Sequence, residues 1–290
     1  MTSGHDDPLQ EAPDQKDSEY ISSVLAYIRE LSGGAALALN ARVNLHFQPD
    51  LYLVDGISVL DGLVASGMYL SQFETGVSNG GQTAHPGGER FAWEQRMFAG
   101  VYDTLRPASR PKYGALNHHH DSYGAAPRFG ACYFRLRREV LERATFCYPD
   151  SVFQPDNFAT ADRFGLLEMA AVPPTDDPLD HYIEAHVHGP VIVSRDVEAL
   201  VLDPSYRGTA IDTAAQNLDC PLEWHPGYRV SLAVIRQHPD YRGVHIVRLA
   251  ERVAEDSALT PELIGRARRE GTHDPQLLKK VWHYVARFGR

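Results

Sequence analysis

Residues 180–190 read DHYIEAHVHGP and place one glutamate and several histidines within an otherwise apolar segment. Successive side chains of a β-strand point to opposite faces of the sheet. If this segment is a strand, Glu184, His186 and His188 share one face, and the apolar residues between them share the other. A carboxylate beside imidazoles on one strand face is typical of either a metal centre or the wall of an active site.

The composition of the 290-residue chain is that of an ordinary soluble globular protein, with 43% hydrophobic and 23% charged residues. A formal net charge of -10 disfavours electrostatic binding to the phosphate backbone of nucleic acids over a large surface. Nucleic acid is therefore a poor candidate partner. The three cysteines are widely spaced and include no C-x-x-C pair. This cysteine pattern indicates a reducing compartment and excludes a zinc ribbon.

Residues 1–17 are polar and acidic and lack the basic segment and apolar run of a signal peptide, so we expect a disordered tail. The sequence contains no run of about 18 apolar residues, and neither a membrane-spanning helix nor a membrane partner is expected. These features predict a protein that is cytoplasmic at synthesis. Export by a route that reads no N-terminal signal is left open.

Residues 18–290 are predicted to form one α+β domain, with helical extensions at both ends and a β-rich centre. Apolar residues recur at helical spacing over 21–31 and again over 277–285. Residues 76–88 are dense in glycine and polar side chains, and we expect a mobile loop with a functional role.

One hypothesis for the 180–190 segment is a metal-dependent hydrolase that uses His186, His188 and a third ligand from the histidines at 118–120. Glu184 could also join these ligands. NHHHD at 117–121 offers more histidines, but three adjacent histidines point in different directions, and the sequence has no H-E-x-x-H motif. The G-x-S-x-G elbow of serine hydrolases and the glycine loops that bind phosphate are also absent. The metal hypothesis is kept as the alternative.

Short motifs elsewhere in the chain favour another interpretation. They are LHFQPD with His46, GISVLDGLVASG ending at Gly67, MYLSQF with Tyr69 and Ser71, and YIEAHVHGPV with Glu184. In this order they resemble the ADP-ribosyltransferase superfamily, in the branch that opens with a histidine motif. The chain is also similar to a bacterial family of uncharacterised proteins.

The resemblance implies a split, mostly antiparallel sheet over about residues 43–202, followed by a C-terminal extension over about 203–290. It also implies an NAD-dependent ADP-ribosyltransferase that cleaves the nicotinamide–ribose bond and passes ADP-ribose to an acceptor. NAD is then the substrate, and no metal is expected. The transition state of this cleavage carries positive charge on the ribose, which a nearby carboxylate stabilises.

By the resemblance, Glu184 holds the ribose 2'-hydroxyl, His46 positions the adenosine-side ribose, and Tyr69 stacks on the nicotinamide. Further contacts with NAD are expected from Phe47, Gly67, Ser71, Gln72 and Arg128, with Lys112 as a second candidate for the pyrophosphate. Tyr182 stands where arginine-modifying members carry glutamine or glutamate, so arginine is not the expected acceptor. The net charge favours a protein or small-molecule acceptor. Simple NAD hydrolysis is left open, and so is the biological role as effector, toxin or housekeeping enzyme.

Overall fold

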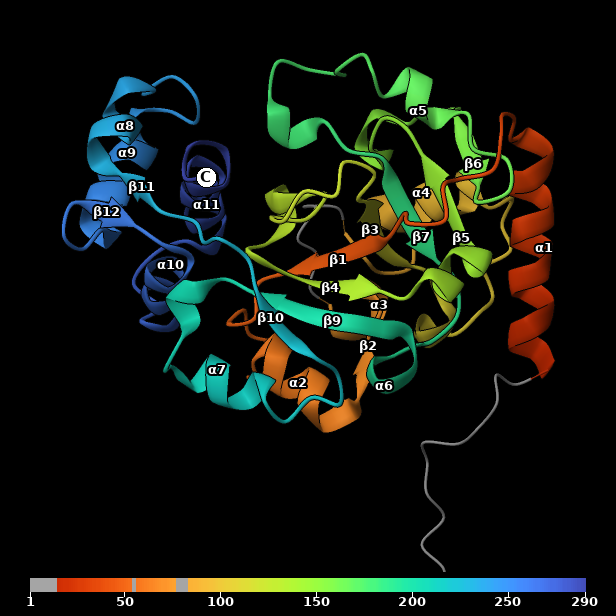
Figure 1. The fold of residues 1–290 in the computed structure, drawn as a ribbon, viewed down its shortest axis with the longest axis horizontal. Coiled ribbons are helices and arrows are strands. Elements are labelled where there is room, and N and C mark those ends of the chain that lie inside the picture. The colour runs from red at the N-terminus through yellow and green to blue at the C-terminus, as the bar shows by residue number, and fades with distance from the viewer. Residues whose placement is uncertain (1–14, 54–55, 77–82) are drawn as a thin grey trace, which may run out of the picture.

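Eight strands form one sheet at the centre of the protein (Figure 1). In chain order they are β1 (Val43–Phe47), β3 (Lys112–Leu116), β4 (Cys132–Leu136), β5 (Ala144–Cys147), β6 (Phe158–Thr160), β7 (Glu184–Val187), β9 (Val197–Leu202) and β10 (Leu222–Trp224). They lie side by side in the order β10-β9-β4-β1-β3-β7-β5-β6. The β9–β10 pair is parallel and the other neighbours are antiparallel. This computed structural model describes residues 15–53, 56–76 and 83–290, and it confirms an α+β protein with a mostly antiparallel sheet.

A separate two-stranded sheet joins β2 (Met68–Tyr69) to β8 (Val191–Ile192), with Tyr69 opposite Val191. The resemblance led us to expect a split central sheet. The eight main strands instead form one uninterrupted sheet, and only the β2–β8 pair is separate from it. The chain turns between β7 and β8 at Gly189, which adopts a left-handed φ of 75° that favours glycine. The turn brings the strand after Glu184 back beside Tyr69. Another small sheet pairs β11 (Val230–Ser231) with β12 (Ala258–Leu259).

Helix α1 (Gln15–Leu31) packs against one end of the sheet. Its Val24 and Ile28 are fully buried, in one apolar cluster with Phe98 and Tyr102. The helix begins inside the predicted tail, because its backbone is helical from Gln15 onward, whereas residues 1–14 lie outside the described part.

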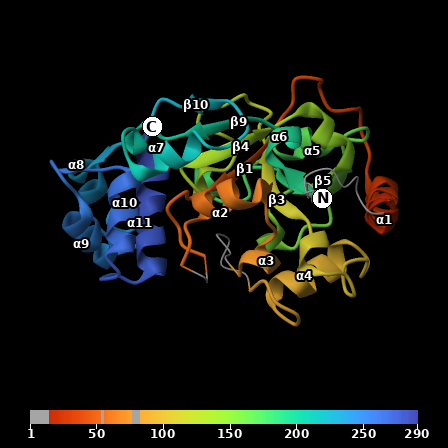
Figure 2. The ribbon, with the colours of Figure 1, turned by 90° about the horizontal axis from the view of Figure 1, so that it is seen from below.

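Three α-helices lie between β1 and β3 in the part of the chain that the structure describes: α2 (Val59–Ser66), α3 (Gln72–Thr75) and α4 (Glu89–Met97). Figure 2 shows α3 and α4 on the same side of the sheet. Residues 77–82 of the predicted mobile loop lie outside the described residues. The structure describes the end of this loop from residue 83 onward. In this part the Thr83 carbonyl accepts a hydrogen bond from the Arg90 backbone N–H at 3.2 Å.

Short helices connect the central strands. They are η1 (Pro107–Ser109), η2 (Pro127–Phe129), η3 (Arg138–Arg143), η4 (Ser151–Phe153), α5 (Leu166–Met169), η5 (Pro178–Asp180), α6 (Val193–Asp196), η6 (Pro204–Tyr206) and α7 (Ala210–Ala215). Within the described ranges, none of the helices has the length and apolar character needed to cross a membrane.

The C-terminal extension consists mainly of α8 (Leu232–Gln237), α9 (Val244–Val253), α10 (Pro261–Arg269) and α11 (Pro275–Phe288). These helices group at the end of the molecule opposite α1 (Figures 1 and 2). Buried contacts fix the group to the core. The Trp282 indole donates a hydrogen bond to the Pro127 carbonyl at 2.9 Å, and Arg268 pairs with the buried Asp50 at 3.2 Å.

Candidate active site

A cavity opens between β1, β2, β3, α2 and the short helices η2 and η4. Six of the eight residues predicted to bind or cleave NAD line it, although they come from distant parts of the sequence. They are His46, Phe47, Tyr69, Gln72, Arg128 and Glu184. The wall also carries an apolar surface, formed by residues such as Leu63, Met68, Phe129 and Phe153. A polar set on an apolar background is typical of a small-molecule site.

Glu184 is the first residue of β7 and has only 4% of its surface exposed. Its Oε1 accepts a hydrogen bond from His186 Nε2 at 2.9 Å, and its Oε2 accepts one from the Ser151 hydroxyl at 3.0 Å. Burial alone would raise the pKa of Glu184, but these hydrogen bonds and the charges around the carboxylate, including Arg90, hold it below its ordinary value. The structure therefore keeps an ionised carboxylate in a fixed position at the cavity wall.

A chain of buried hydrogen bonds begins at the ring nitrogen of His186 that does not contact Glu184. His186 Nδ1 lies 3.1 Å from the Thr145 hydroxyl, which lies 2.9 Å from His188 Nε2. His188 Nδ1 in turn lies 2.6 Å from the Tyr102 hydroxyl. Burial, with charges nearby, lowers the pKa of His188 well below its ordinary value, so this imidazole is neutral. Because both its ring nitrogens are engaged, His188 does not converge with His186 on a common ligand point.

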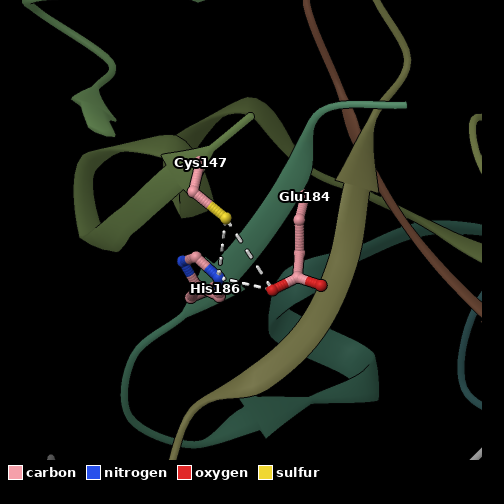
Figure 3. Close-up of side chains that lie close together, drawn as sticks. All are labelled: Cys147, Glu184 and His186. Atoms are coloured by element: carbon pink, nitrogen blue, oxygen red, sulfur yellow. Dashed lines mark hydrogen bonds and ion pairs between the residues drawn. The ribbon is translucent and has the colours of Figure 1, made fainter. Parts of the chain in front are cut away.

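The side chain that does meet Glu184 and His186 is Cys147, at the end of β5 (Figure 3). Cys147 Sγ lies 3.9 Å from His186 Nε2 and 4.0 Å from Glu184 Oε1. The three ligand atoms lie within 4.8 Å of one another and all three residues are buried. The histidines of NHHHD are elsewhere: His118 contacts the Leu116 carbonyl and His120 contacts Asn40.

His46 lines the cavity with both ring nitrogens already engaged. Nδ1 lies 3.0 Å from the Gly130 carbonyl, and Nε2 accepts the Ala126 backbone N–H at 3.2 Å. Burial, against the Gly130 hydrogen bond, lowers the pKa of His46 to about 3, so the imidazole is neutral. His46 therefore holds the backbone on either side of η2 in place.

Tyr69 and Phe47 form an aromatic wall of the cavity. Their ring centroids are 6.4 Å apart in an edge-to-face arrangement, and Phe134 packs edge-on against Tyr69 from the core at 6.1 Å. Burial raises the pKa of the Tyr69 phenol, which stays neutral. The two rings are inclined to each other by 69°, so a planar ligand group could lie against the face of one ring and the edge of the other.

Two of the predicted residues, Gly67 and Ser71, do not line the cavity and have structural roles. Gly67 ends α2 with a left-handed φ of 63° and donates its N–H to the Leu63 carbonyl. Ser71 begins α3 in a capping box with Glu74, and its hydroxyl donates to the Pro107 carbonyl at 2.8 Å. Together they set the ends of the segment that carries Tyr69.

Arg90 of α4 is a cation at the cavity that the sequence analysis missed. Only 4% of it is exposed, its guanidinium lies 4.0 Å from the Tyr113 ring centroid, and its Nη1 donates to the Ser151 hydroxyl at 3.3 Å. Arg128, which was predicted, is engaged in an ion pair with Asp180. Lys112 also lines the wall, and its ammonium donates to the carbonyl of Ala108 at 2.7 Å.

Three buried polar atoms on cavity-lining residues have no hydrogen-bond partner among the described residues. They are Asn44 Nδ2, Gln72 Oε1 and Arg90 Nε. Buried polar groups in proteins are nearly always paired, so these three atoms call for a partner such as water or a ligand group. Two donors and one acceptor suit a ligand that carries oxygen acceptors and at least one hydroxyl or amide group.

Asp150 is a second carboxylate on the same wall. Its Oδ1 lies 3.1 Å from the Ser151 hydroxyl, which also contacts Glu184. Burial, followed by repulsion from Glu184, raises the pKa of Asp150 to about 7. The two acids therefore differ in protonation, with Glu184 ionised and Asp150 able to carry a proton near neutral pH.

The fold and the cavity define an α+β protein with an ionised glutamate held at the wall of a cavity that polar and apolar side chains line. Within that class, the chain belongs to the family described as "Protein of unknown function (DUF3626)", whose sequence model matches residues 42–175 and 165–287. No curated protein matches the chain. The family description assigns no activity.

Proposed function

We propose that this protein is an NAD-dependent ADP-ribosyltransferase that cleaves the bond between nicotinamide and ribose. The observation that carries the proposal is the cavity itself, which gathers His46, Tyr69 and Glu184 from three separate segments. These are the residues, in the same chain order, on which the resemblance to the histidine-motif branch rests. NAD is the substrate, and the proposed chemistry needs no metal.

Glu184 supplies the electrostatic part of the reaction. Departure of nicotinamide leaves an oxocarbenium-like ribose, and a fixed carboxylate stabilises that charge without having to reorganise. Hydrogen bonds from His186 and Ser151 fix both carboxylate oxygens of Glu184. In this proposal the ribose 2'-hydroxyl takes up the remaining acceptor capacity of the same carboxylate.

The other cavity residues bind the rest of NAD. Tyr69 and Phe47 offer the flat wall for nicotinamide, and the engaged ring of His46 borders the adenosine-side ribose. Arg90 is the better candidate for the pyrophosphate, because its Nε has no partner among the described residues, whereas Arg128 is paired with Asp180.

The acceptor of ADP-ribose is proposed to be a protein or a small molecule other than an arginine side chain. Tyr182 occupies the position that arginine-modifying members fill with glutamine or glutamate, and it lies 3% exposed beside the Phe129 ring. The formal net charge of -10 disfavours nucleic acid. We also propose a reducing compartment such as the cytoplasm, since all three cysteines are free thiols.

Nicotinamide release from NAD by wild-type protein and by Glu184→Gln tests the proposal. Glutamine can keep both hydrogen bonds if its oxygen faces His186 and its amide faces the rotatable Ser151 hydroxyl, so the fold and NAD affinity should be retained. Loss of one preorganised electrostatic contact lowers the rate by about 10²–10³. Glu168→Gln, at an exposed position of α5, is the matched control and should turn over NAD normally. Wild-type protein that neither binds nor cleaves NAD, or a folded Glu184→Gln protein that still cleaves it, would overturn the proposal.

A further inference from the structure

We propose that Cys147, Glu184 and His186 form a binding site for a zinc-like transition-metal ion, and that the bound ion blocks NAD cleavage. The binding part of this inference stands on the structure alone. The inhibitory part rests on the proposed function, because it requires Glu184 to be the carboxylate that stabilises the ribose.

The strand register places the three ligands on one side of the sheet. Cys147 is directly opposite Glu184 in the antiparallel β5–β7 pair, and His186 follows two residues after Glu184 on the same face (Figure 3). Antiparallel neighbours and alternate strand residues are close and rigidly held, so the site needs no loop to order around the ion.

The separations are close to those of a metal site. Tetrahedral zinc with sulfur, nitrogen and oxygen ligands holds those atoms about 3.3–3.6 Å apart. Here Cys147 Sγ lies 3.9 Å from His186 Nε2 and 4.0 Å from Glu184 Oε1, while Nε2 and Oε1 lie 2.9 Å apart. Shifts of a few tenths of an ångström, achieved by small side-chain rotations, would convert this arrangement into the zinc geometry.

The donor types and their support also fit zinc. Thiolate, imidazole and carboxylate together favour Zn²⁺ over Mg²⁺ or Ca²⁺, which prefer oxygen ligands. A metal-bound histidine usually donates its other N–H to an oxygen, and the Thr145 hydroxyl lies 3.1 Å from His186 Nδ1 for that purpose. On binding, the Cys147 thiol proton is released to solvent. The proton with which His186 Nε2 donates to Glu184 also leaves that nitrogen, so that the metal-bound ring carries a proton on Nδ1 only.

Three protein ligands leave a fourth position for water or another small ligand, as in accessible zinc sites rather than closed structural ones. Glu184 lines the cavity, whereas Cys147 and His186 lie fully buried behind it, so the path of the ion runs from the space that would hold NAD past the Glu184 carboxylate. A carboxylate bound to a cation no longer presents its full charge to an oxocarbenium-like ribose. Metal occupation and NAD cleavage are therefore mutually exclusive.

Binding is tested on the full chain, stripped with a chelator and titrated with Zn²⁺, and with Co²⁺ as a spectroscopic probe of thiolate ligation. Wild-type protein should bind one Zn²⁺ per chain and show a thiolate–cobalt absorption band. Cys147→Ser should lose the band and bind Zn²⁺ about 10-fold or more weakly. Cys220→Ser, at a half-buried thiol outside the cluster, should behave as wild type. No stoichiometric binding by wild type, or an unchanged cobalt band in Cys147→Ser, would overturn the site.

Inhibition is tested separately, as the ratio of NAD turnover without and with Zn²⁺ in each protein. That ratio should be large for wild type and Cys220→Ser and near one for Cys147→Ser. An equal ratio in all three proteins would overturn the inhibitory role. If wild type binds Zn²⁺ through Cys147 but never cleaves NAD, the proposed function fails while the metal site stands.

Discussion

Thr145 of β5 and His186 of β7 are cross-strand partners, and the Thr145 hydroxyl lies 3.1 Å from the His186 ring. The same hydroxyl lies 2.9 Å from His188. One small side chain thus satisfies two buried imidazoles and fixes the ring that donates to Glu184. The orientation of the glutamate therefore depends on a residue that does not line the cavity.

Thr145→Val should destabilise the protein by about 1–3 kcal/mol, because it leaves a buried nitrogen on each histidine without a partner. Valine has nearly the shape of threonine, so packing is conserved. Denaturant unfolding measures the change, and Thr145→Ser, which keeps the hydroxyl, should unfold close to wild type. Equal stability of the valine and serine variants would show that the hydroxyl does not hold the histidines.

Tyr69→Phe should retain NAD turnover, whereas Tyr69→Ala should lower kcat/KM for NAD by about tenfold. Aromatic contacts contribute about 0.5–1.5 kcal/mol beyond simple area burial, and the alanine variant removes the flat wall beside Phe47. Steady-state kinetics with NAD compare the two variants. If phenylalanine were as damaging as alanine, the hydroxyl rather than the ring would be the functional part of Tyr69.

Arg90→Lys should weaken NAD binding by about tenfold or more. Lysine keeps the charge but loses the planar fork, and hydrogen bonds to charged groups contribute roughly 1.5–3 kcal/mol. Titration calorimetry measures the affinity. Arg96→Lys, on the same helix but paired with the exposed Asp156, is the control and should bind NAD normally. Unchanged affinity in Arg90→Lys would exclude this arginine as the pyrophosphate contact.

His46 should make stability fall as the solution becomes acidic. Burial, with smaller contributions from His225 and Arg290, lowers the pKa of His46 from 6.5 to about 3 in the folded protein. The unfolded chain therefore binds this proton more readily between these values. The stabilisation is complete above pH 6.5 and is lost as the pH falls towards 3, by up to about 1.4 kcal/mol per pH unit.

The variant His46→Asn tests this pH dependence, since its amide can still donate to the Gly130 carbonyl but does not titrate. Between pH 7 and 5 its unfolding free energy should fall by about 2 kcal/mol less than that of wild type. His245→Asn, at an exposed histidine, should follow wild type throughout. Parallel curves for His46→Asn and wild type would show that His46 does not titrate differently on folding.

Alternation along residues 180–190 was enough to predict a strand and to place Glu184 and His186 on one face. It could not identify the neighbouring strand, and so it paired His186 with His188 instead of with Cys147. The hydroxyls of Thr145 and Tyr102 contact the two ring nitrogens of His188. Only the tertiary fold brings these hydroxyls to the histidine. Register between distant strands has no local signal in a single sequence.

The same limit explains the other differences. Gly67 and Ser71 belong to motifs that mark the segment around Tyr69, but a motif does not distinguish a cap from a ligand contact. Arg90 belongs to no recognisable sequence motif. It lies in the first turn of an ordinary helix, just after a glycine-rich segment. Its position at the cavity arises from the packing of α4 beside Tyr113 of β3, which helical periodicity cannot reveal.

The hydrogen bond from Trp282 to the Pro127 carbonyl has a practical consequence for work with shortened chains. Pro127 lies in the segment whose ends hold the His46 ring, through Ala126 and Gly130. A fragment cut near residue 203 would keep every cavity-lining side chain yet lose the indole that anchors this wall. Screens for activity or ligands should therefore use all 290 residues, because an inactive fragment would not report on the activity of the longer chain.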